Sequence, residues 1–277
     1  MIKSSDLEFH GTYQPEKIYL SKILKLASEG FAGTKFEISD ISGIPTGKRK
    51  GKVEPHIKYA AYMGLISFSN AKGVYKLSLT KLGEEVYLQD PYLYEELSCW
   101  LCHYGISKRN GGAPQWIYLI QDFHPGFNNI ISQERLFTLA GSWCDVPQEY
   151  MLKKVFSVVK NSYMEGFFEQ IRFLEWNDNI KFLEHLQKPE FLYLYAYALL
   201  DSWERMYPNK QEISELDLKN GIGFNKIFGF NEDECNLVID SLVSEGIITV
   251  NRQLFPMTII RTSSLGSMIP YLYSRLL

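Results

Sequence analysis

The sequence comprises 277 residues, of which 45% are hydrophobic and 14% aromatic, so the chain can bury the core of two or three packed units. Its net charge of −3 and isoelectric point of about 6.0 exclude binding of nucleic acid through overall positive charge; a local basic patch would be needed. Residues 1–10 are polar, and the most apolar window, residues 191–200, is about half the ~20 residues that cross a bilayer. We therefore expect a cytoplasmic protein without a signal peptide or membrane partner, with its four scattered cysteines as reduced thiols.

The N-terminal part predicts a winged helix-turn-helix over residues 14–90. Helical patterns of apolar residues lie at residues 16–29, 36–41 and 53–63. Two alternating segments predict strands at residues 65–69 and 74–79, joined by a turn at residues 70–73. In such a domain the third helix usually enters the major groove of DNA, and the hairpin forms the wing.

The middle of the chain predicts further helices and a hairpin. Asp90-Pro91 resembles a helix start, with Asp as N-cap and Pro at the first position. Later helices are predicted at residues 114–123, 132–143 and 147–163, of which the last two form a second helix-turn-helix pattern. A hairpin is predicted at residues 171–176 and 180–185.

The C-terminal part loosely repeats the first plan in element order. A helix at residues 189–206 is apolar on nearly every side and should be central. Helices at residues 213–219 and 232–245 and strands at residues 247–250 and 254–261 follow. We predict a mainly α fold with small β-hairpins (α+β) in three domains: a winged helix-turn-helix at residues 1–90, a helical middle at 91–186 and a winged-helix-like domain at 187–277.

The candidate DNA-binding residues are basic. Lys48, Arg49 and Lys50 lie between Gly47 and Gly51 before the third helix, and Lys52 follows Gly51. Lys58 lies on that helix and Lys72 on the wing. A winged helix brings this turn to the phosphate backbone. The alternative is an ordinary solvated turn.

A second basic face is predicted on the helix at residues 147–163. Lys153, Lys154 and Lys160 lie away from its apolar stripe, and an exposed helix face without DNA is the simpler interpretation. The helix at residues 232–245 is acidic, so we assign it to domain packing or protein partners.

No catalytic residue is identified, and no cofactor or metal site is predicted. The segment at residues 43–49 lacks the spacing and hydroxyl residue of a nucleotide-binding P-loop. Cys99-Trp100-Leu101-Cys102-His103 matches a haem-attachment string, but it lies on an amphipathic helix. Acidic sets such as Glu84 with Glu85, or Asp122 near His124, lack diagnostic spacing and are interpreted as solvated charges.

Several short motifs resemble one known family. They are Phe9-His10-Gly11-Thr12-Tyr13, Leu79-Thr80-Lys81-Leu82-Gly83, Asp90-Pro91-Tyr92-Leu93-Tyr94-Glu95, Trp100-Leu101-Cys102-His103, Trp116-Ile117-Tyr118 with Asp122-Phe123, and residues 189–201. The chain resembles, over nearly its whole length, a bacterial family found beside DNA phosphorothioation and phage-defence genes. It departs from the family pattern in the two cysteines around Trp100. The resemblance implies a role in sulfur modification of the DNA backbone or the linked defence, and it identifies no catalytic residue.

Three functions therefore remain open. The first is a DNA-binding component of a phosphorothioation system, with double-stranded DNA and other proteins of that system as partners. The second is a DNA nicking endonuclease of the same system, which would need a divalent metal. The third is a winged-helix transcriptional regulator, which would bind one sequence about 10³-fold or more tightly than bulk DNA.

Overall fold

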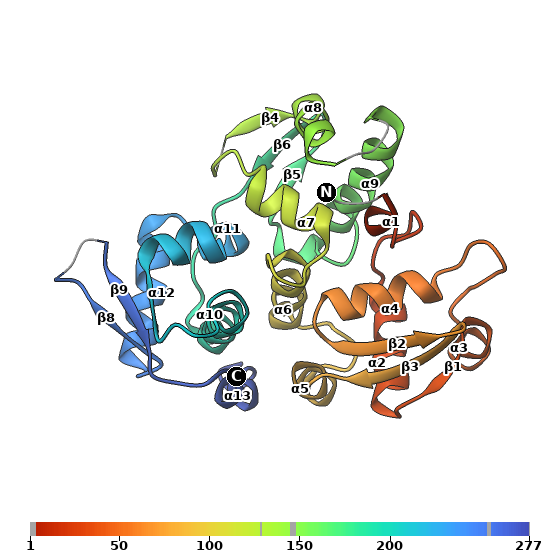
Figure 1. Ribbon diagram of the computed structural model, residues 1–277, viewed down its shortest axis with the longest axis horizontal. Helices are drawn as coiled ribbons and strands as arrows, with labels where there is room; N and C mark the ends of the chain where they lie inside the picture. Colours follow the sequence, from red (N-terminus) through yellow and green to blue (C-terminus); the bar gives the residue numbers. More distant parts are fainter. Residues whose placement is uncertain (1–3, 128, 145–147, 254–255, 277) are drawn as a thin grey trace.

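The protein is described by a computed structural model covering residues 4–127, 129–144, 148–253 and 256–276. Three times along the chain, a helix and a short strand are followed by helical segments and two further strands. Each resulting antiparallel sheet has three strands, with the last in the middle: β1-β3-β2, β4-β6-β5 and β7-β9-β8. Figure 1 shows these three units as separate lobes around central helices. The predicted α+β class is confirmed.

The first unit agrees closely with the predicted helices and strands. It contains α2 (Lys17–Ser28), β1 (Ala32–Thr34), α3 (Lys35–Ser42), α4 (Val53–Tyr62), β2 (Ile66–Ala71) and β3 (Val74–Leu79). The predicted turn is centred on Lys72 and Gly73, which both have positive φ, and Asn70 Oδ1 accepts a hydrogen bond from Gly73 N at 3.1 Å. The short strand β1 was not predicted.

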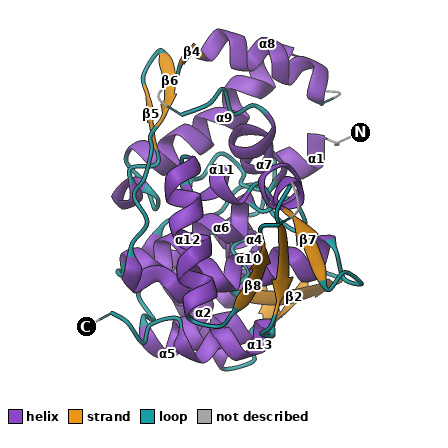
Figure 2. Cartoon of the chain, turned by 90° about the vertical axis from the view of Figure 1, so that its left-hand side faces the viewer, coloured by secondary structure: helices purple, strands orange, loops and turns teal. Residues whose placement is uncertain are grey.

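The second unit contains the predicted middle helices and hairpin, but the hairpin is shorter than predicted, because its first strand begins at Leu174 and its second ends at Phe182. It contains α7 (Pro114–Ile117), the π-helix η1 (Tyr118–Asp122), β4 (Ile130–Ser132), α8 (Gln133–Trp143), α9 (Gln148–Met164), β5 (Leu174–Trp176) and β6 (Asn179–Phe182). Pro147, the predicted first residue of α9, lies outside the described residues. Seen from the side of the third unit, α8 and β4 form the upper end of the molecule (Figure 2).

The third unit differs from prediction at its start. It contains α10 (Leu192–Met206), β7 (Glu212–Ser214), the π-helix η4 (Asp217–Ile222), α11 (Phe224–Phe228), α12 (Glu232–Ser244), β8 (Ile248–Asn251) and β9 (Thr258–Arg261). The helix predicted at residues 213–219 was wrong at its N-terminal end, because Ile213 pairs with Ile259 in the sheet. Predicted residues 254–255 lie outside the described chain.

The three units use the same device where the first strand ends. Thr34 caps α3 by accepting a hydrogen bond from Glu37 N, and Ser132 accepts one from Arg135 N. Ser214 Oγ accepts one from Asp217 N at 3.0 Å. Such a cap satisfies an amide that the first helical turn leaves without a partner, so a single Ser or Thr both ends the strand and starts the helix.

The helices after the first unit also correct a prediction. The helix α5 (Lys81–Gln89) was not predicted, and Asp90 lies at its C-terminal end. The next helix, α6, begins at Glu96 rather than directly after Pro91. Asp90 nevertheless caps the intervening turn, because its carboxylate accepts hydrogen bonds from Tyr94 N and Glu95 N, both at 2.9 Å.

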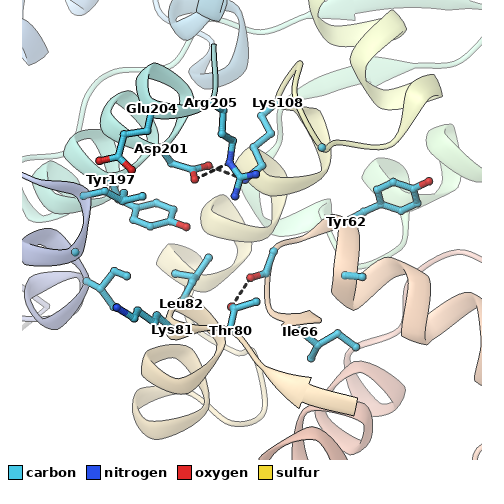
Figure 3. Close-up of a pocket in the computed structure, with 16 residues that line it drawn as sticks. Tyr62, Ile66, Thr80, Lys81, Leu82, Lys108, Tyr197, Asp201, Glu204 and Arg205 are labelled. Carbon is cyan, nitrogen blue, oxygen red and sulfur yellow. Dashed lines mark hydrogen bonds and ion pairs between the residues drawn. The ribbon is translucent and has the colours of Figure 1, made fainter. Parts of the chain in front are cut away.

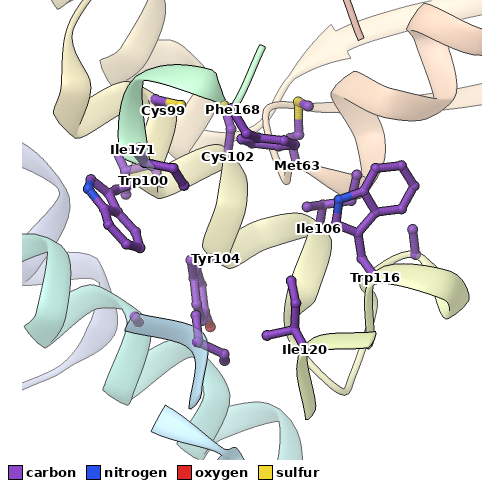
Figure 4. Close-up of a cluster of buried hydrophobic side chains, with 14 of the residues drawn as sticks. Met63, Cys99, Trp100, Cys102, Tyr104, Ile106, Trp116, Ile120, Phe168 and Ile171 are labelled. Atoms are coloured by element: carbon purple, nitrogen blue, oxygen red, sulfur yellow. The ribbon is translucent and has the colours of Figure 1, made fainter. Parts of the chain in front are cut away.

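Helix α6 (Glu96–Ser107) is the centre of the core. All of its residues from Leu97 to Ser107 are buried. Figure 4 shows side chains of α6 packed against Trp116, Phe168 and Met63, which come from the first and second units. The remaining short segments are α1 (Ser4–Leu7), η2 (Glu169–Ile171), η3 (Pro189–Phe191), α13 (Leu265–Met268) and η5 (Ile269–Tyr271).

Candidate functional site

Unpaired positive charge gathers at one end of the first unit. We call this the basic end: Lys48, Arg49 and Lys50 on the loop between α3 and α4, with Lys72 and Lys76 on the β2–β3 hairpin. All five residues are exposed, and no ion pair joins any of them to an acidic residue of the described chain. In Figure 1 the loop projects beyond α4 at the right-hand side of the molecule.

The loop of the basic end has a defined shape. Lys52 N donates a hydrogen bond to Pro45 O at 2.8 Å, which closes the loop at its base. Gly51 lies so close to Thr46 that an added Cβ would be 2.6 Å from Thr46 Cα. A glycine is therefore required for this closure, and the three basic side chains extend from a folded turn.

Glu54 connects the loop region to the hairpin. Its carboxylate accepts hydrogen bonds from Lys35 Nζ at 3.1 Å and from Tyr75 Oη at 2.7 Å. Burial opposes ionisation of Glu54, but these hydrogen bonds outweigh it and lower the pKa. The start of α4 is thereby fixed to β3, and Lys35, although close to the loop, is neutralised.

The other two predicted residues of this region are placed differently. Lys52 forms an ion pair with Glu16 at 2.7 Å and lies 5.0 Å from the ring centre of Tyr19. The hydrogen bond to Glu16 raises the pKa of Lys52. Lys52 therefore anchors the loop to Glu16 instead of presenting a free charge. Lys58 is half-buried on α4 and lines a groove with Phe68 of β2.

Helix α4, the expected groove-reading helix, is largely covered by other parts of the chain. Tyr59 is fully buried, donates a hydrogen bond to Tyr13 O at 2.8 Å and lies 6.0 Å from the Trp116 ring. Phe9 packs against Tyr59 and Tyr62 at 5.1 and 4.7 Å. Only a half-buried stripe remains accessible along α4, formed by Glu54, Lys58, Ala61 and Tyr62.

The predicted basic face on α9 is partly used within the chain. Lys154 Nζ lies 3.7 Å from Glu8, and Lys160 Nζ donates to Asn177 O at 3.0 Å. Lys153 is exposed. By contrast, α12 is acidic at the surface, and its Glu232 and Asp240 pair with Lys219 and Arg252.

Sequence reasoning missed a buried ionic network beside α6. Asp201 of α10 accepts hydrogen bonds from Lys108 Nζ at 2.6 Å, Tyr104 Oη at 2.7 Å and Arg205 Nε at 2.8 Å. Burial lowers the pKa of Lys108 and opposes ionisation of Asp201, but the two cations outweigh it and lower the pKa of Asp201. Lys108 and Arg205 therefore stabilise the charged form of Asp201. Asp201 and Arg205 are four residues apart on α10, but Tyr104 and Lys108 lie more than 90 residues earlier, so no local spacing could show that the two pairs meet.

The haem-attachment string lies inside the core. His103 Nε2 donates to the Ile227 carbonyl and Nδ1 accepts from Tyr163 Oη, both at 2.8 Å. Burial lowers the pKa of His103 to about 3 and raises that of Cys99 to about 12. Across the described ranges, no three histidine, cysteine or acidic side chains come together to hold a metal ion.

The chain is thus an α+β protein of three units with one sheet topology and a basic end on the first. Its sequence matches no protein-family model and no curated protein at a significant level. Two solved structures share the architecture. A magnesium-bound crystal structure of SspB aligns with a TM-score of 0.75 and 17% identity, covering 97% of this chain and 88% of SspB.

The second structure, also of SspB, aligns with a TM-score of 0.75 and 16% identity over the same shares of both chains. At this identity the likeness establishes a common fold over nearly the whole length. Among the described helices, none has the length and apolarity needed to cross a membrane.

Proposed function

We propose that this chain is a DNA-binding component of a bacterial DNA phosphorothioation and phage-defence system. The observation that carries the proposal is the basic end, with Lys48, Arg49 and Lys50 exposed on one closed turn and no carboxylate of the described residues paired to them. Arg and Lys in such a position suit phosphate contacts. The fold shared with SspB, a phosphorothioation-system protein, fits the family resemblance of the motifs.

The first unit acts as a winged helix that contacts the DNA backbone. Its element order and hairpin are typical of that class, in which the turn before the third helix lies beside phosphates. Because α4 exposes only a half-buried stripe, it offers few side chains to base edges. We therefore infer binding governed by phosphate contacts, with little dependence on base sequence. This argues against the transcriptional regulator.

Removing the loop charges tests the proposal. Lys48→Ala/Arg49→Ala/Lys50→Ala should weaken duplex binding at least tenfold, or about 1.4 kcal/mol. The slope of log K against log salt should fall by roughly 2–3 units, as about three phosphate contacts are lost. Fluorescence anisotropy with a labelled duplex at four salt concentrations measures both, and a thermal melt checks that the fold is unchanged.

A matched variant removes the same number of charges from α9: Lys153→Ala/Lys154→Ala/Lys160→Ala. We expect it to bind within a few-fold of the wild type. If the loop variant instead binds like the wild type at every salt concentration, the basic end is a solvated surface. If only the α9 variant loses affinity, the second unit carries the DNA contact.

DNA nicking is the second candidate function, favoured by the magnesium ion in one SspB structure. The described residues of this chain show no grouped metal ligands, so we derive no metal-dependent step from them. Incubation of the protein with supercoiled plasmid, with and without magnesium or manganese, tests this candidate. Nicked circles that appear only with metal would support it; unchanged plasmid under both conditions would leave the binding role.

A further inference from the structure

A cavity of about 470 Å³ lies between the first and third units, within the size range of small-molecule sites. Figure 3 shows its two polar walls. Thr80, Lys81 and Leu82, at the start of α5, form one wall, and Asp201, Arg205 and Tyr197 of α10 face them with Lys108. Leu265 of α13 also lines the cavity. Both units therefore contribute to one site, which is open to solvent on one side.

The cavity carries an excess of positive charge. Lys108 and Arg205 share the single carboxylate of Asp201. Arg205 uses its Nε for that pair, while its two terminal nitrogens have no hydrogen-bond partner in the described chain. Lys81 adds a third cation from the opposite wall and has no ion pair with the described residues. Against these stands the exposed carboxylate of Glu204, so one positive charge is left uncompensated.

The start of α5 adds backbone donors to the same wall. Thr80 Oγ1 accepts from Gly83 N at 2.9 Å and donates to Gly64 O at 2.6 Å. The backbone N–H groups of Lys81 and Leu82 are in the first turn of α5, where no helix carbonyl can accept from them. The Thr80 side chain accepts from Gly83 N and not from these two groups. A helix start with free amides and a positive dipole end favours an anion.

Tyr197 adds a polar group to the cavity wall. Tyr197 is only 6% exposed, and its hydroxyl points into the cavity in Figure 3. No hydrogen bond joins this hydroxyl to any other residue of the described chain. The hydroxyl is accessible from the open cavity, so a ligand there can form a hydrogen bond with it.

We propose that this cavity binds the phosphate group of a small phosphorylated ligand of nucleotide size. Arg205 and Lys81 hold the phosphate from opposite walls, and the α5 amides donate to it. The Tyr197 hydroxyl donates to a further oxygen, and the apolar remainder lies against Tyr62 and Leu265. The same chemistry could come from a free nucleotide or from the phosphorylated end of a DNA strand. The site does not depend on the proposed DNA contact of the basic end.

Isothermal titration calorimetry with four probes tests the inference. They are inorganic phosphate, adenosine monophosphate, adenosine without phosphate, and a short single-stranded oligonucleotide with a terminal phosphate. We expect the monophosphate to bind at one site per chain and adenosine not to bind. If the oligonucleotide binds more tightly than the monophosphate, the phosphate comes from the end of a DNA strand. If the monophosphate binds more tightly, the ligand is a free nucleotide.

Three variants locate the site. Lys81→Gln and Arg205→Gln should each weaken monophosphate binding about tenfold or more, because each removes a charge-assisted contact. Tyr197→Phe removes a hydroxyl that has no other partner, and should weaken it about threefold or more. Lys25→Gln, an exposed lysine of α2 outside the cavity, is the matched control and should bind like the wild type.

Arg205→Gln also disturbs the pair with Asp201, so Lys81→Gln and Tyr197→Phe decide the outcome if that variant fails to fold. The inference is overturned if none of the phosphorylated probes binds at millimolar concentration, or if Lys81→Gln and Tyr197→Phe bind like the wild type. The variant Lys48→Ala/Arg49→Ala/Lys50→Ala should retain monophosphate binding, which separates failure of this site from failure of the basic end.

Discussion

Replacing Asp201 by alanine should strongly destabilise the protein. The side chains of Asp201 and Lys108 are only 3% and 7% exposed, so Asp201→Ala leaves a buried ammonium group without its counter-charge. Breaking a buried pair in this way costs about 3–5 kcal/mol. For 277 residues, an unfolding entropy of about 2.1 cal/mol/K per residue converts this to a decrease in Tm of about 5–9 °C.

Differential scanning calorimetry measures this decrease in Tm, and two further variants serve as controls for it. Asp240→Ala removes one partner of a pair whose side chains are 52% and 57% exposed, so it should cost less than about 1 kcal/mol. Lys108→Met in the Asp201→Ala background removes the unpaired charge and should restore much of the lost stability.

The pH dependence of Asp201→Ala provides a second check. Burial lowers the pKa of Lys108, and the unfolded chain binds the proton more tightly than the folded variant does. The stability defect should therefore shrink as pH rises toward the ordinary lysine pKa of about 10.4. Equal melting of Asp201→Ala and Asp240→Ala would refute the reasoning, because it would mean that the buried network carries no more than a surface pair.

Two other predictions concern the core. Burial lowers the pKa of His10, His56 and His124 to about 4. It lowers the pKa of His103 to about 3. Folding therefore favours the neutral rings. In urea unfolding, the free energy of unfolding should not change above about pH 6.5, and below that pH it should fall by up to about 1.4 kcal/mol per pH unit for each ring. An unchanged urea midpoint between pH 7.5 and pH 5 would contradict this. Gly105→Ala would place a Cβ 2.6 Å from the Met63 carbonyl carbon and should lower stability by about 1–3 kcal/mol, whereas Gly266→Ala, with open space around it, should not.

The long periodic elements of the fold could be predicted from the sequence because their signals are local. Local patterns of apolar, turn and helix-ending residues located α2, α4, α9, α10 and α12, and alternation with turn residues located the hairpins of the first two units. The first strand of each unit escaped because β1, β4 and β7 have only three residues, too few for a period to show. A usable signal was present at their ends, in the Ser or Thr that caps the following helix, such as Thr34 with Glu37.

The candidate site was only partly readable for a different reason. A run of Lys and Arg between glycines predicts an exposed turn, and Lys48, Arg49 and Lys50 are indeed exposed. The pairing of Lys52 with Glu16 depends on how the loop folds against α2. Likewise, the covering of α4 depends on Phe9 and Trp116, which lie in other segments of the chain. Tertiary contacts of this kind leave no periodic mark in the sequence.

The central position of α6 has a consequence for synthesis on the ribosome. His103 donates to the carbonyl of Ile227, 124 residues later in the chain, a delay of about 6–25 s at ordinary rates of translation. For most of that interval α6 has its first-unit neighbours but lacks α10, and α11 is missing until its end, so apolar side chains such as Trp100 and Tyr104 remain uncovered by Phe228. A nascent chain stalled before α11 should therefore recruit chaperones, and fragments that end before it should aggregate instead of forming independent domains.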